Sequence, residues 1–257
     1  MTELVFRDDP YARNCAARVV AADPGCAGPP RPGSGGAGGF AEASGRFIRL
    51  DRTVFYAAGG GQPGDTGLLR LADGSAIAIV DAVKGDGPDE VLHVPEASAV
   101  LPAPGAEVTA EIDWARRHRL MRMHTCLHLL CAVVPGEVTG GQVGDGKGRL
   151  DFNLPDTRLD KERIAAELNR LIAEDHPARP RWVADAELAA RPDLVRTMSV
   201  KPPAGQGRVR LLEIAGVDLQ PCGGTHVART GEIGPVEVTK IENKGKQNRR
   251  INLAFRS

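Results

Sequence analysis

Two pairs of residues with metal-binding side chains share a four-residue spacing. His124 and His128 fall in a stretch of helical periodicity, and because one helical turn takes about 3.6 residues, both imidazoles emerge on one face. Cys222 and His226 repeat the spacing within residues 221–226, PCGGTH, whose two glycines favour a tight loop. Three ring nitrogens and one thiolate are a donor set suited to Zn²⁺, so these four residues are the predicted metal ligands.

Each pair also has a simpler explanation when it is taken alone. Histidines at helical spacing are often a buried, hydrogen-bonded pair, and residues 222–226 could form an ordinary turn. A helical metalloprotease motif would place glutamate directly after the first histidine as general base, but Thr125 stands there. Cys126 and Cys131 are expected to be small buried residues. Three further histidines have no partner at ligand spacing and are set aside: His93, His118 and His176.

The composition is ordinary for a soluble globular protein of 257 residues, with 42% apolar and 26% charged residues. No apolar run is long enough to span a bilayer, and the N-terminus lacks a signal-peptide pattern. Five widely spaced cysteines, an odd number, favour reduced thiols. We therefore expect a cytoplasmic protein with no membrane partner.

Positive charge is concentrated in two places, although the net charge is zero. Such segregation can create a basic face that binds nucleic-acid phosphates. For either cluster alone, solvated surface charge is the simpler interpretation. The candidate phosphate contacts are Arg116, Arg117, Arg119 and Arg122 in the first cluster, and Lys240, Lys244, Lys246, Arg249 and Arg250 in the second.

The first part of the chain contains short β-like runs separated by turn residues, which predicts a small, mainly antiparallel, barrel-like β domain over residues 1–106. A Gly-, Pro- and Ser-rich insertion at about 26–44 is expected to be a mobile surface segment. Pro102, Pro104 and Gly105 mark the expected boundary. The predicted strands are residues 17–21, 47–50, 67–71, 76–83 and 91–94.

Residues 107–257 mix helical and strand-like patterns, which indicates an α+β fold and makes this the domain that carries the metal site. Apolar residues recur at helical spacing over 114–134. A second helix is predicted over 157–175, with Thr157 and Asp160 resembling a capping box. The predicted strands are residues 108–112, 150–154, 208–214, 236–243 and 249–255.

A glycine-rich segment, residues 50–67 with the sequence LDRTVFYAAGGGQPGDTG, is the most specific pattern in the chain. Its three consecutive glycines, Gly59, Gly60 and Gly61, expose backbone N–H groups and permit close approach of a ligand. The Gln62 amide can both donate and accept hydrogen bonds. On the residues alone, a turn between two strands is the simpler explanation.

This segment, the histidine pair in RMHTCLHLL (122–130) and the CGGTH loop (222–226) resemble, in this order, the motifs of alanyl-tRNA synthetase editing domains and their free-standing AlaX relatives. The resemblance spans nearly the whole chain, and the insertion is the clearest departure. It implies a zinc-containing hydrolase acting in trans on mischarged tRNA, which cleaves the ester between amino acid and terminal ribose. The leading substrate is serine on tRNA(Ala), and glycine on tRNA(Ala) is a second candidate.

The resemblance also implies roles for individual residues. The Thr53 hydroxyl is a candidate contact for a serine side chain, and Gln142 resembles a family glutamine of the editing pocket. Gly59–Gly61 and Gln62 are expected to bind substrate. His124, His128 and Gln62 are the candidate catalytic residues, and the basic clusters are expected to hold the acceptor stem of the tRNA.

Two other interpretations remain open. A zinc-stabilised RNA-binding module without catalysis accounts for the ligands and the basic clusters but leaves the glycine-rich segment without a purpose. The metal ligands also resemble those of threonyl-tRNA synthetase editing, which makes tRNA(Thr) an alternative substrate. Nothing resembles an adenylate-forming domain, so no nucleotide cofactor is expected. Zinc could activate water, polarise the ester or orient the substrate, and the sequence does not choose among these.

Overall fold

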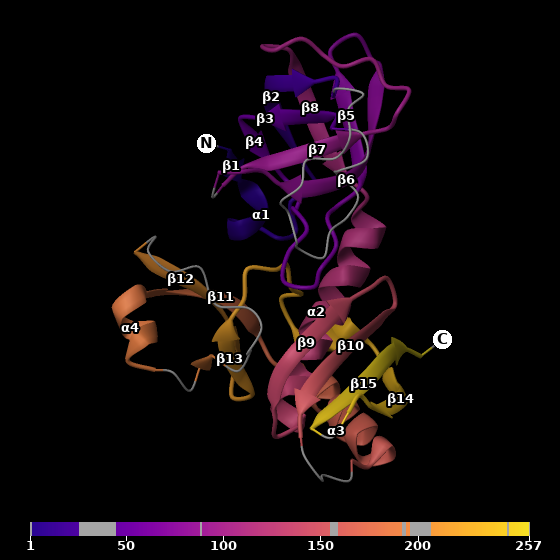
Figure 1. Cartoon of the computed structure of the whole chain (residues 1–257), viewed down its shortest axis with the longest axis vertical. Coiled ribbons are helices and arrows are strands. Elements are labelled where there is room, and N and C mark those ends of the chain that lie inside the picture. The colour runs from indigo at the N-terminus through magenta and orange to yellow at the C-terminus, as the bar shows by residue number, and fades with distance from the viewer. Residues whose placement is uncertain are drawn as a thin grey trace. The chain divides into compact units, whose positions relative to one another are not determined.

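The computed structural model describes residues 2–25, 45–87, 89–154, 159–191, 194–195, 207–245 and 247–256. The chain divides into two compact units, one formed by Met1–Gly59 and Pro63–Arg117, the other by Gly60–Gln62 and His118–Ser257. Figure 1 shows the elements of each unit along the chain. The insertion predicted at about 26–44 lies outside the described residues.

The first unit is built around a closed barrel of antiparallel strands. Alternate side chains point inward, and Ile48, Leu50 and Leu69 are completely buried inside. In spatial order the strands are β2 (Asn14–Asp23), β3 (Phe47–Leu50), β7 (Val91–Pro95), β6 (Ala76–Lys84), β5 (Gly67–Leu71) and β8 (Glu107–Ile112). The predicted α+β class and the antiparallel barrel are both present.

Short elements beside the barrel carry the start of the glycine-rich segment. β1 (Glu3–Leu4) pairs in parallel with β4 (Arg52–Thr53), and α1 (Val5–Asp8) follows β1 directly. Arg117 is completely buried and forms an ion pair with Asp65, which also accepts a hydrogen bond from the backbone N–H of Tyr56 at 2.6 Å. This pair ties the glycine-rich segment to the helix that follows the barrel.

The boundary between the units differs from the one predicted after residue 106. β8 (Glu107–Ile112) pairs with both β2 and β5, so it completes the barrel and belongs to the first unit. Gly60–Gln62 belongs to the second unit, where the backbone N–H of Val143 donates to the carbonyl of Gly61 at 2.8 Å. Both differences come from pairing between segments that lie far apart in the sequence.

The second unit combines two helices with a four-stranded antiparallel sheet. Helix α2 (Trp114–Val133) agrees with the prediction, and Met121, Met123 and Leu129 are completely buried on it, as expected for a helix surrounded by protein. Among the described residues, no helix is both long and apolar enough to cross a membrane. The sheet order is β14 (Val236–Asn243), β15 (Asn248–Phe255), β10 (Lys147–Asn153) and β9 (Glu137–Val143).

The second helix is shorter than predicted. α3 (Lys161–Ala173) starts where the Asp160 carboxylate accepts a hydrogen bond from the backbone N–H of Arg163. This bond gives a partner to a backbone N–H that has none within the first turn of the helix. Asp160 is therefore the N-cap, whereas Thr157 lies outside the described residues. Asn169 on α3 bonds to the backbone of Val236 in both directions and so fastens the helix to the sheet.

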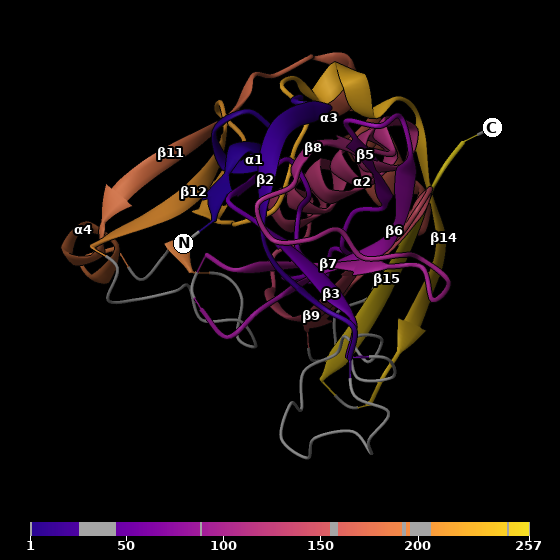
Figure 2. The same ribbon diagram turned by 90° about the horizontal axis from the view of Figure 1, so that it is seen from above.

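A separate three-stranded antiparallel sheet completes the unit. It consists of β11 (Ala178–Ala184), β12 (Arg208–Ile214) and β13 (Asp218–Pro221), with α4 (Asp185–Ala189) after β11 and the short 3-10 helix η2 (Thr230–Ile233) further along the chain. Figure 2 shows β11 and β12 side by side. The sequence did not predict β9, β11 or β13, because β9 contains two glycines, β11 a proline, and β13 only four residues.

Candidate metal centre

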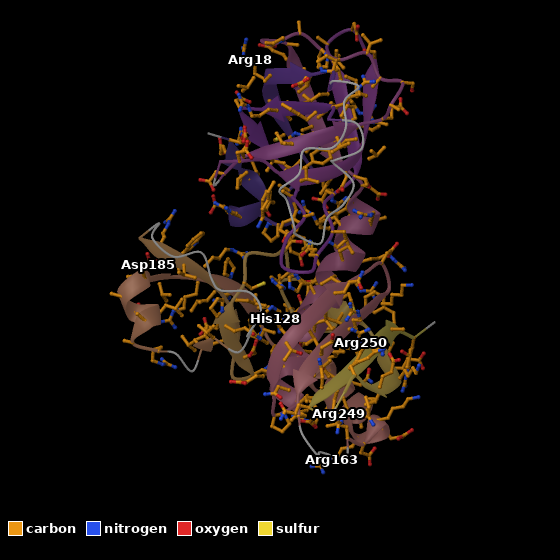
Figure 3. The ribbon with its side chains drawn as sticks, in the orientation of Figure 1. Arg18, His128, Arg163, Asp185, Arg249 and Arg250 are labelled. Carbon is orange, nitrogen blue, oxygen red and sulfur yellow. The ribbon has the colours of Figure 1, made fainter. Side chains whose placement is uncertain are left out.

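The four predicted ligands converge in the second unit. One ligand atom from each of His124, His128, Cys222 and His226 lies within 4.8 Å of all the others. The Cys222 Sγ lies 3.1 Å from Nε2 of His226 and 3.6 Å from Nε2 of His124. All three histidines are buried and Cys222 is half-buried. Figure 3 marks His128 on α2.

A helix and a tethered loop bring these side chains together. α2 supplies both histidines of the first pair from one face. The loop after β13 is held by Arg210, whose guanidinium donates to the carbonyl oxygens of Cys222 at 2.8 Å and Gly224 at 3.0 Å. A Cβ atom at Gly224 would lie 2.3 Å from Cε1 of His124, so glycine permits the loop to approach the helix this closely.

The tautomer of His226 follows from its hydrogen bonds. The Thr125 hydroxyl has one proton, which it donates to the carbonyl of Met121 at 3.0 Å. It must therefore accept from Nδ1 of His226 at 3.2 Å. Nδ1 carries the proton, and Nε2 of His226 is left with the lone pair that a metal ion needs.

The same reasoning fixes His124. The backbone N–H of Thr225 donates to Oε1 of Gln62 at 3.2 Å, and Nε2 of Gln62 donates to the Thr225 hydroxyl at 2.8 Å. Because Oε1 can only accept, the 2.8 Å contact from His124 is donated by its Nδ1. Nε2 of His124 is then the free ligand atom.

His128 is oriented by a buried carboxylate. Its Nδ1 lies 3.1 Å from Oδ2 of Asp218, and Gln220 donates to the same oxygen at 2.7 Å. Hydrogen bonding of a ligating histidine to a carboxylate, carbonyl or similar group is typical of protein metal sites, where it fixes the ring and its tautomer. All three histidines meet this condition, so the residues fit a bound metal ion.

The electrostatics of the site also favour a cation. Burial tends to raise the pKa of Cys222, but the neighbouring His124, His226 and His128 lower it well below its usual value. Burial tends to lower the pKa of His128, yet the Cys222 thiolate and the Asp218 carboxylate raise it to about 10. Burial lowers the pKa of His226 to about 3. A thiolate and a carboxylate thus concentrate negative charge beside the ligand nitrogens.

The glycine-rich segment reaches this centre through Gln62. Gly60 and Gly61 have φ values of 58° and 83°, a left-handed conformation that favours glycine. A Cβ atom at Gly61 would lie 2.8 Å from the carbonyl oxygen of Gly141. Gln62 is buried, and its amide is engaged by His124 and Thr225, so in this structure it positions a predicted ligand. Gly59 belongs to the first unit, where it accepts a hydrogen bond from the Tyr56 hydroxyl.

Thr53 lies in the first unit and is completely buried. Nδ1 of His93 donates to the carbonyl of Ile48 at 2.9 Å, so its Nε2 accepts the Thr53 proton at 2.8 Å. The Thr53 oxygen also accepts from the backbone N–H of Phe55 at 3.0 Å. His93, which the sequence analysis set aside, is thus the direct partner of the proposed serine-contacting residue.

Gln142 and the first basic cluster are placed differently from the ligands. Gln142 is exposed on β9, where Nε of Arg149 approaches its Oε1 at 3.3 Å. All four cations of the first cluster have protein partners. Arg116 donates to the carbonyl of Gly64, and Arg119 pairs with Asp145. Arg122 donates to the carbonyl of Ile233, and Arg117 is the buried partner of Asp65.

The second basic cluster is also largely paired among its described members. Lys240 and Lys244 lie 3.0 and 3.4 Å from the same Glu242 oxygen, and Arg250 binds Asp151. Arg249 donates to nearby backbone carbonyls, and Lys246 lies outside the described residues. Phosphate binding by either cluster stays a prediction.

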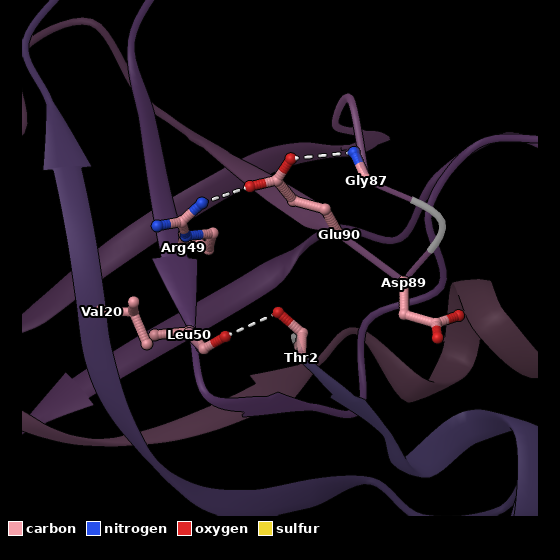
Figure 4. Close-up of a pocket in the computed structure, with 7 residues that line it drawn as sticks. All are labelled: Thr2, Val20, Arg49, Leu50, Gly87, Asp89 and Glu90. Atoms are coloured by element: carbon pink, nitrogen blue, oxygen red, sulfur yellow. Dashed lines mark hydrogen bonds and ion pairs between the residues drawn. The ribbon is translucent and has the colours of Figure 1, made fainter.

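A cavity of about 330 Å³ in the first unit contains none of the predicted site residues. Figure 4 shows its lining, in which Arg49 pairs with Glu90 and the Thr2 hydroxyl donates to the carbonyl of Leu50. Asp89, also in the lining, pairs with Arg7. These charges are internally satisfied, which gives the cavity no evident chemistry.

The sequence matches two protein-family models. Residues 209–252 match the second additional domain of threonyl and alanyl tRNA synthetases, and residues 38–116 match class II (A) tRNA synthetases. Each unit therefore contains a segment that is similar to tRNA synthetase sequences.

Full-length comparisons narrow the assignment. The alanyl-tRNA editing protein AlaX-M of Methanosarcina acetivorans is 39% identical over 217 residues, covering 80% of this chain and 87% of that protein. AlaX-M of Saccharolobus solfataricus is 31% identical over 258 residues, 98% of each chain. The alanine–tRNA ligase of Metallosphaera sedula is 33% identical over 251 residues, which cover 94% of this chain but 25% of the ligase. The chain belongs to the AlaX family of alanyl-tRNA editing proteins, which confirms the resemblance drawn from its motifs.

Proposed function

We propose that this chain is a cytoplasmic, zinc-dependent hydrolase that deacylates mischarged tRNA in trans. Its principal substrate is seryl-tRNA(Ala), and glycyl-tRNA(Ala) is the second. The observation that carries the proposal is the cluster of three histidines and one cysteine, in which each imidazole is held by a hydrogen bond at its Nδ1, in a chain of the AlaX family.

Zinc would be held by Nε2 of the three histidines and by Sγ of Cys222. When bound, it supplies Lewis acidity and positive charge for ester hydrolysis. The protein's own contribution is positional, since Gln62, Thr125 and Asp218 each hold one histidine by its outer nitrogen. Burial of the histidines keeps this hydrogen-bonded frame away from competing water.

The number of protein donors separates a structural role of zinc from a catalytic one. Four donors complete a tetrahedral set typical of structural zinc, whereas catalytic sites usually have three protein donors. Cys222 is the least buried of the four residues, so Cys222→Ser is the informative variant. Retained zinc with altered deacylation supports a catalytic role, and loss of zinc together with thermal stability supports a structural one.

Selection of serine requires a contact that alanine cannot make. A difference of one small group is worth only about 1–3 kcal/mol in an apolar pocket, whereas a hydrogen-bonding site discriminates further. We assign this contact to Thr53. Because its proton is donated to His93, its remaining lone pair accepts, and the serine hydroxyl is the donor.

The test is time-resolved deacylation by the zinc-loaded protein. Seryl-tRNA(Ala), glycyl-tRNA(Ala), alanyl-tRNA(Ala) and seryl-tRNA(Thr) are compared, with chelator-treated and zinc-restored protein as controls. We expect fast loss of serine from tRNA(Ala), retention of alanine, and dependence on zinc. Preference for seryl-tRNA(Thr) would transfer the assignment to tRNA(Thr), and tRNA binding without cleavage of any ester would establish the non-catalytic RNA-binding alternative.

A further inference from the structure

The sheet β11–β12–β13 has two different faces. On one face Val183, Val209 and Leu211 pack with Leu194 into a small apolar core. Strand register determines the opposite face, because residues directly opposite each other on paired strands point the same way. This second face carries Trp182 opposite Arg210, Ala184 opposite Arg208, Leu212 opposite Gln220 and Ile214 opposite Asp218.

The second face is continuous with the candidate metal centre. At β13, Asp218 contacts His128 and Gln220 contacts Asp218. At β12, Arg210 holds the loop of Cys222, whose backbone N–H also donates to the carbonyl of Arg210 at 3.1 Å. Trp182 is the next residue outward on β11, so two strand spacings, about 10 Å, separate its backbone from that of Cys222.

Trp182 is accessible at this position. Its side chain is 37% exposed. Among the described residues of the second unit, no other large apolar side chain is exposed. The guanidinium carbon of Arg208 lies 4.5 Å from the ring centroid. The strand register places two cations on this face beside Trp182, namely Arg208 and Arg210, of which Arg210 is buried and donates to carbonyl oxygens of the Cys222 loop. An aromatic ring beside cations is the combination that binds unpaired nucleotides, through stacking on bases and attraction of phosphates.

We propose that Trp182, backed by Arg208, is a stacking platform for the terminal base of the tRNA whose ester reaches the four ligands. The inference rests on the proposed function and names a base-binding part of that site. In a charged tRNA, one ribose carries both the ester and the terminal base, so the base must lie close to the hydrolytic centre. Trp182 lies on the same sheet face as the Cys222 loop, two strand spacings away, and such a base would lie at this position.

The simpler alternative is that Arg208 and Trp182 only pack against each other at a strand end. The two explanations differ in their response to RNA. Stacking on an aromatic side chain changes affinity by about 5- to 150-fold per base, and phenylalanine can replace tryptophan because the interaction uses the ring face. A packing role instead predicts altered stability without a dependence on the terminal base.

The experiment measures binding of uncharged tRNA(Ala), intact or lacking its terminal adenosine, to zinc-loaded protein at one salt concentration. We expect Trp182→Ala to weaken binding of intact tRNA about 5- to 150-fold and to leave binding of the truncated tRNA unchanged. Trp182→Phe should retain most of the affinity. Arg208→Lys, which keeps the charge but loses the planar guanidinium, should give a smaller loss than Trp182→Ala.

The matched control is Arg181→Ala, which removes a cation from the same strand but from the opposite face. It should leave the difference between intact and truncated tRNA unchanged. Equal binding of intact tRNA by Trp182→Ala and wild type, or equal losses for both RNAs, would overturn the proposal. Zinc content is measured for every variant. Ester cleavage by the wild type, assayed in parallel, tests the proposed function separately, because the dependence on the terminal base is measured without cleavage.

Discussion

Two buried histidines, one in each unit, show how neighbours decide what burial does to an imidazole. His93 in the barrel unit has neutral partners, Thr53 and the carbonyl of Ile48, and burial lowers its pKa to about 4. His128 in the second unit is also buried, and burial tends to lower its pKa in the same way. Its neighbours Cys222 and Asp218 nevertheless raise that pKa to about 10. Burial with neutral partners gives a fixed, uncharged hydrogen-bonding group, whereas burial beside anions gives a site that attracts cations.

The largest effect should come from removing a ligand. Cys222→Ala and His128→Ala each delete one of four donors, and we expect both to lose zinc and deacylation activity. Metal content by elemental analysis and hydrolysis of seryl-tRNA(Ala) are the measurements. His93→Ala is the contrasting variant, which should keep its zinc. Full metal content in both ligand variants would remove Cys222 and His128 from the metal site.

His93 in the barrel unit should make the stability of the folded protein depend on pH. Since the pKa of His93 falls from 6.5 to about 4 on folding, the unfolded chain binds more protons between these values. The resulting stabilisation, ~3 kcal/mol, is complete above about pH 6.5 and is lost as the pH falls towards 4. Denaturant unfolding of wild type and His93→Gln at pH 4.5, 5.5 and 7, both without metal, isolates this contribution as a difference. Parallel stability curves for the two proteins would refute the assignment.

The carboxylate behind His128 should tune metal affinity. Asp218→Asn keeps the shape of the side chain but removes its charge, and outer hydrogen-bond partners of ligands typically contribute 10- to 100-fold in affinity. We expect a loss of this size in competition with a chelating dye, and an altered Co²⁺ absorption spectrum. Asp151→Asn is the matched control, because Asp151 is a buried carboxylate of the same unit that pairs with Arg250. Similar losses in both variants would mean that general charge, rather than the contact with His128, determines affinity.

The smallest effect should come from Thr53. Thr53→Val removes the bonds to His93 and Phe55 together with the one proposed for the serine hydroxyl. Only the last of these contacts the substrate, and it is worth about 0.5–1.5 kcal/mol, so serine removal should slow by about 2- to 12-fold. Removal of glycine, which has no hydroxyl, should change less. Thr53→Ser should retain the serine rate. An unchanged rate on seryl-tRNA(Ala) with Thr53→Val would exclude the proposed contact and leave Thr53 with its structural bond to His93.

The sequence predicted those features that local patterns specify. Short β-like runs separated by turn residues located the barrel strands, and helical periodicity located α2 within one residue at its end. The four-residue spacings identified the predicted ligands, because on a helix or in a tight glycine-containing loop such spacing places side chains on one side. These patterns depend only on residues that are close together in the sequence, and so they can be recognised without knowledge of the fold.

Only the tertiary structure assigned partners. Asp218 reaches His128 across 90 residues of sequence, Thr125 reaches His226 across 101, and Gln62 reaches Thr225 across 163. The same holds for Arg117, which the sequence placed among tRNA contacts and the fold buries. A hydrogen bond is sensitive to differences of a few tenths of an ångström in the distance between its two atoms. The segments that carry these atoms meet only when the chain folds. The residues alone therefore determined which side chains can bind a metal, and only folding determined which groups hold them in place.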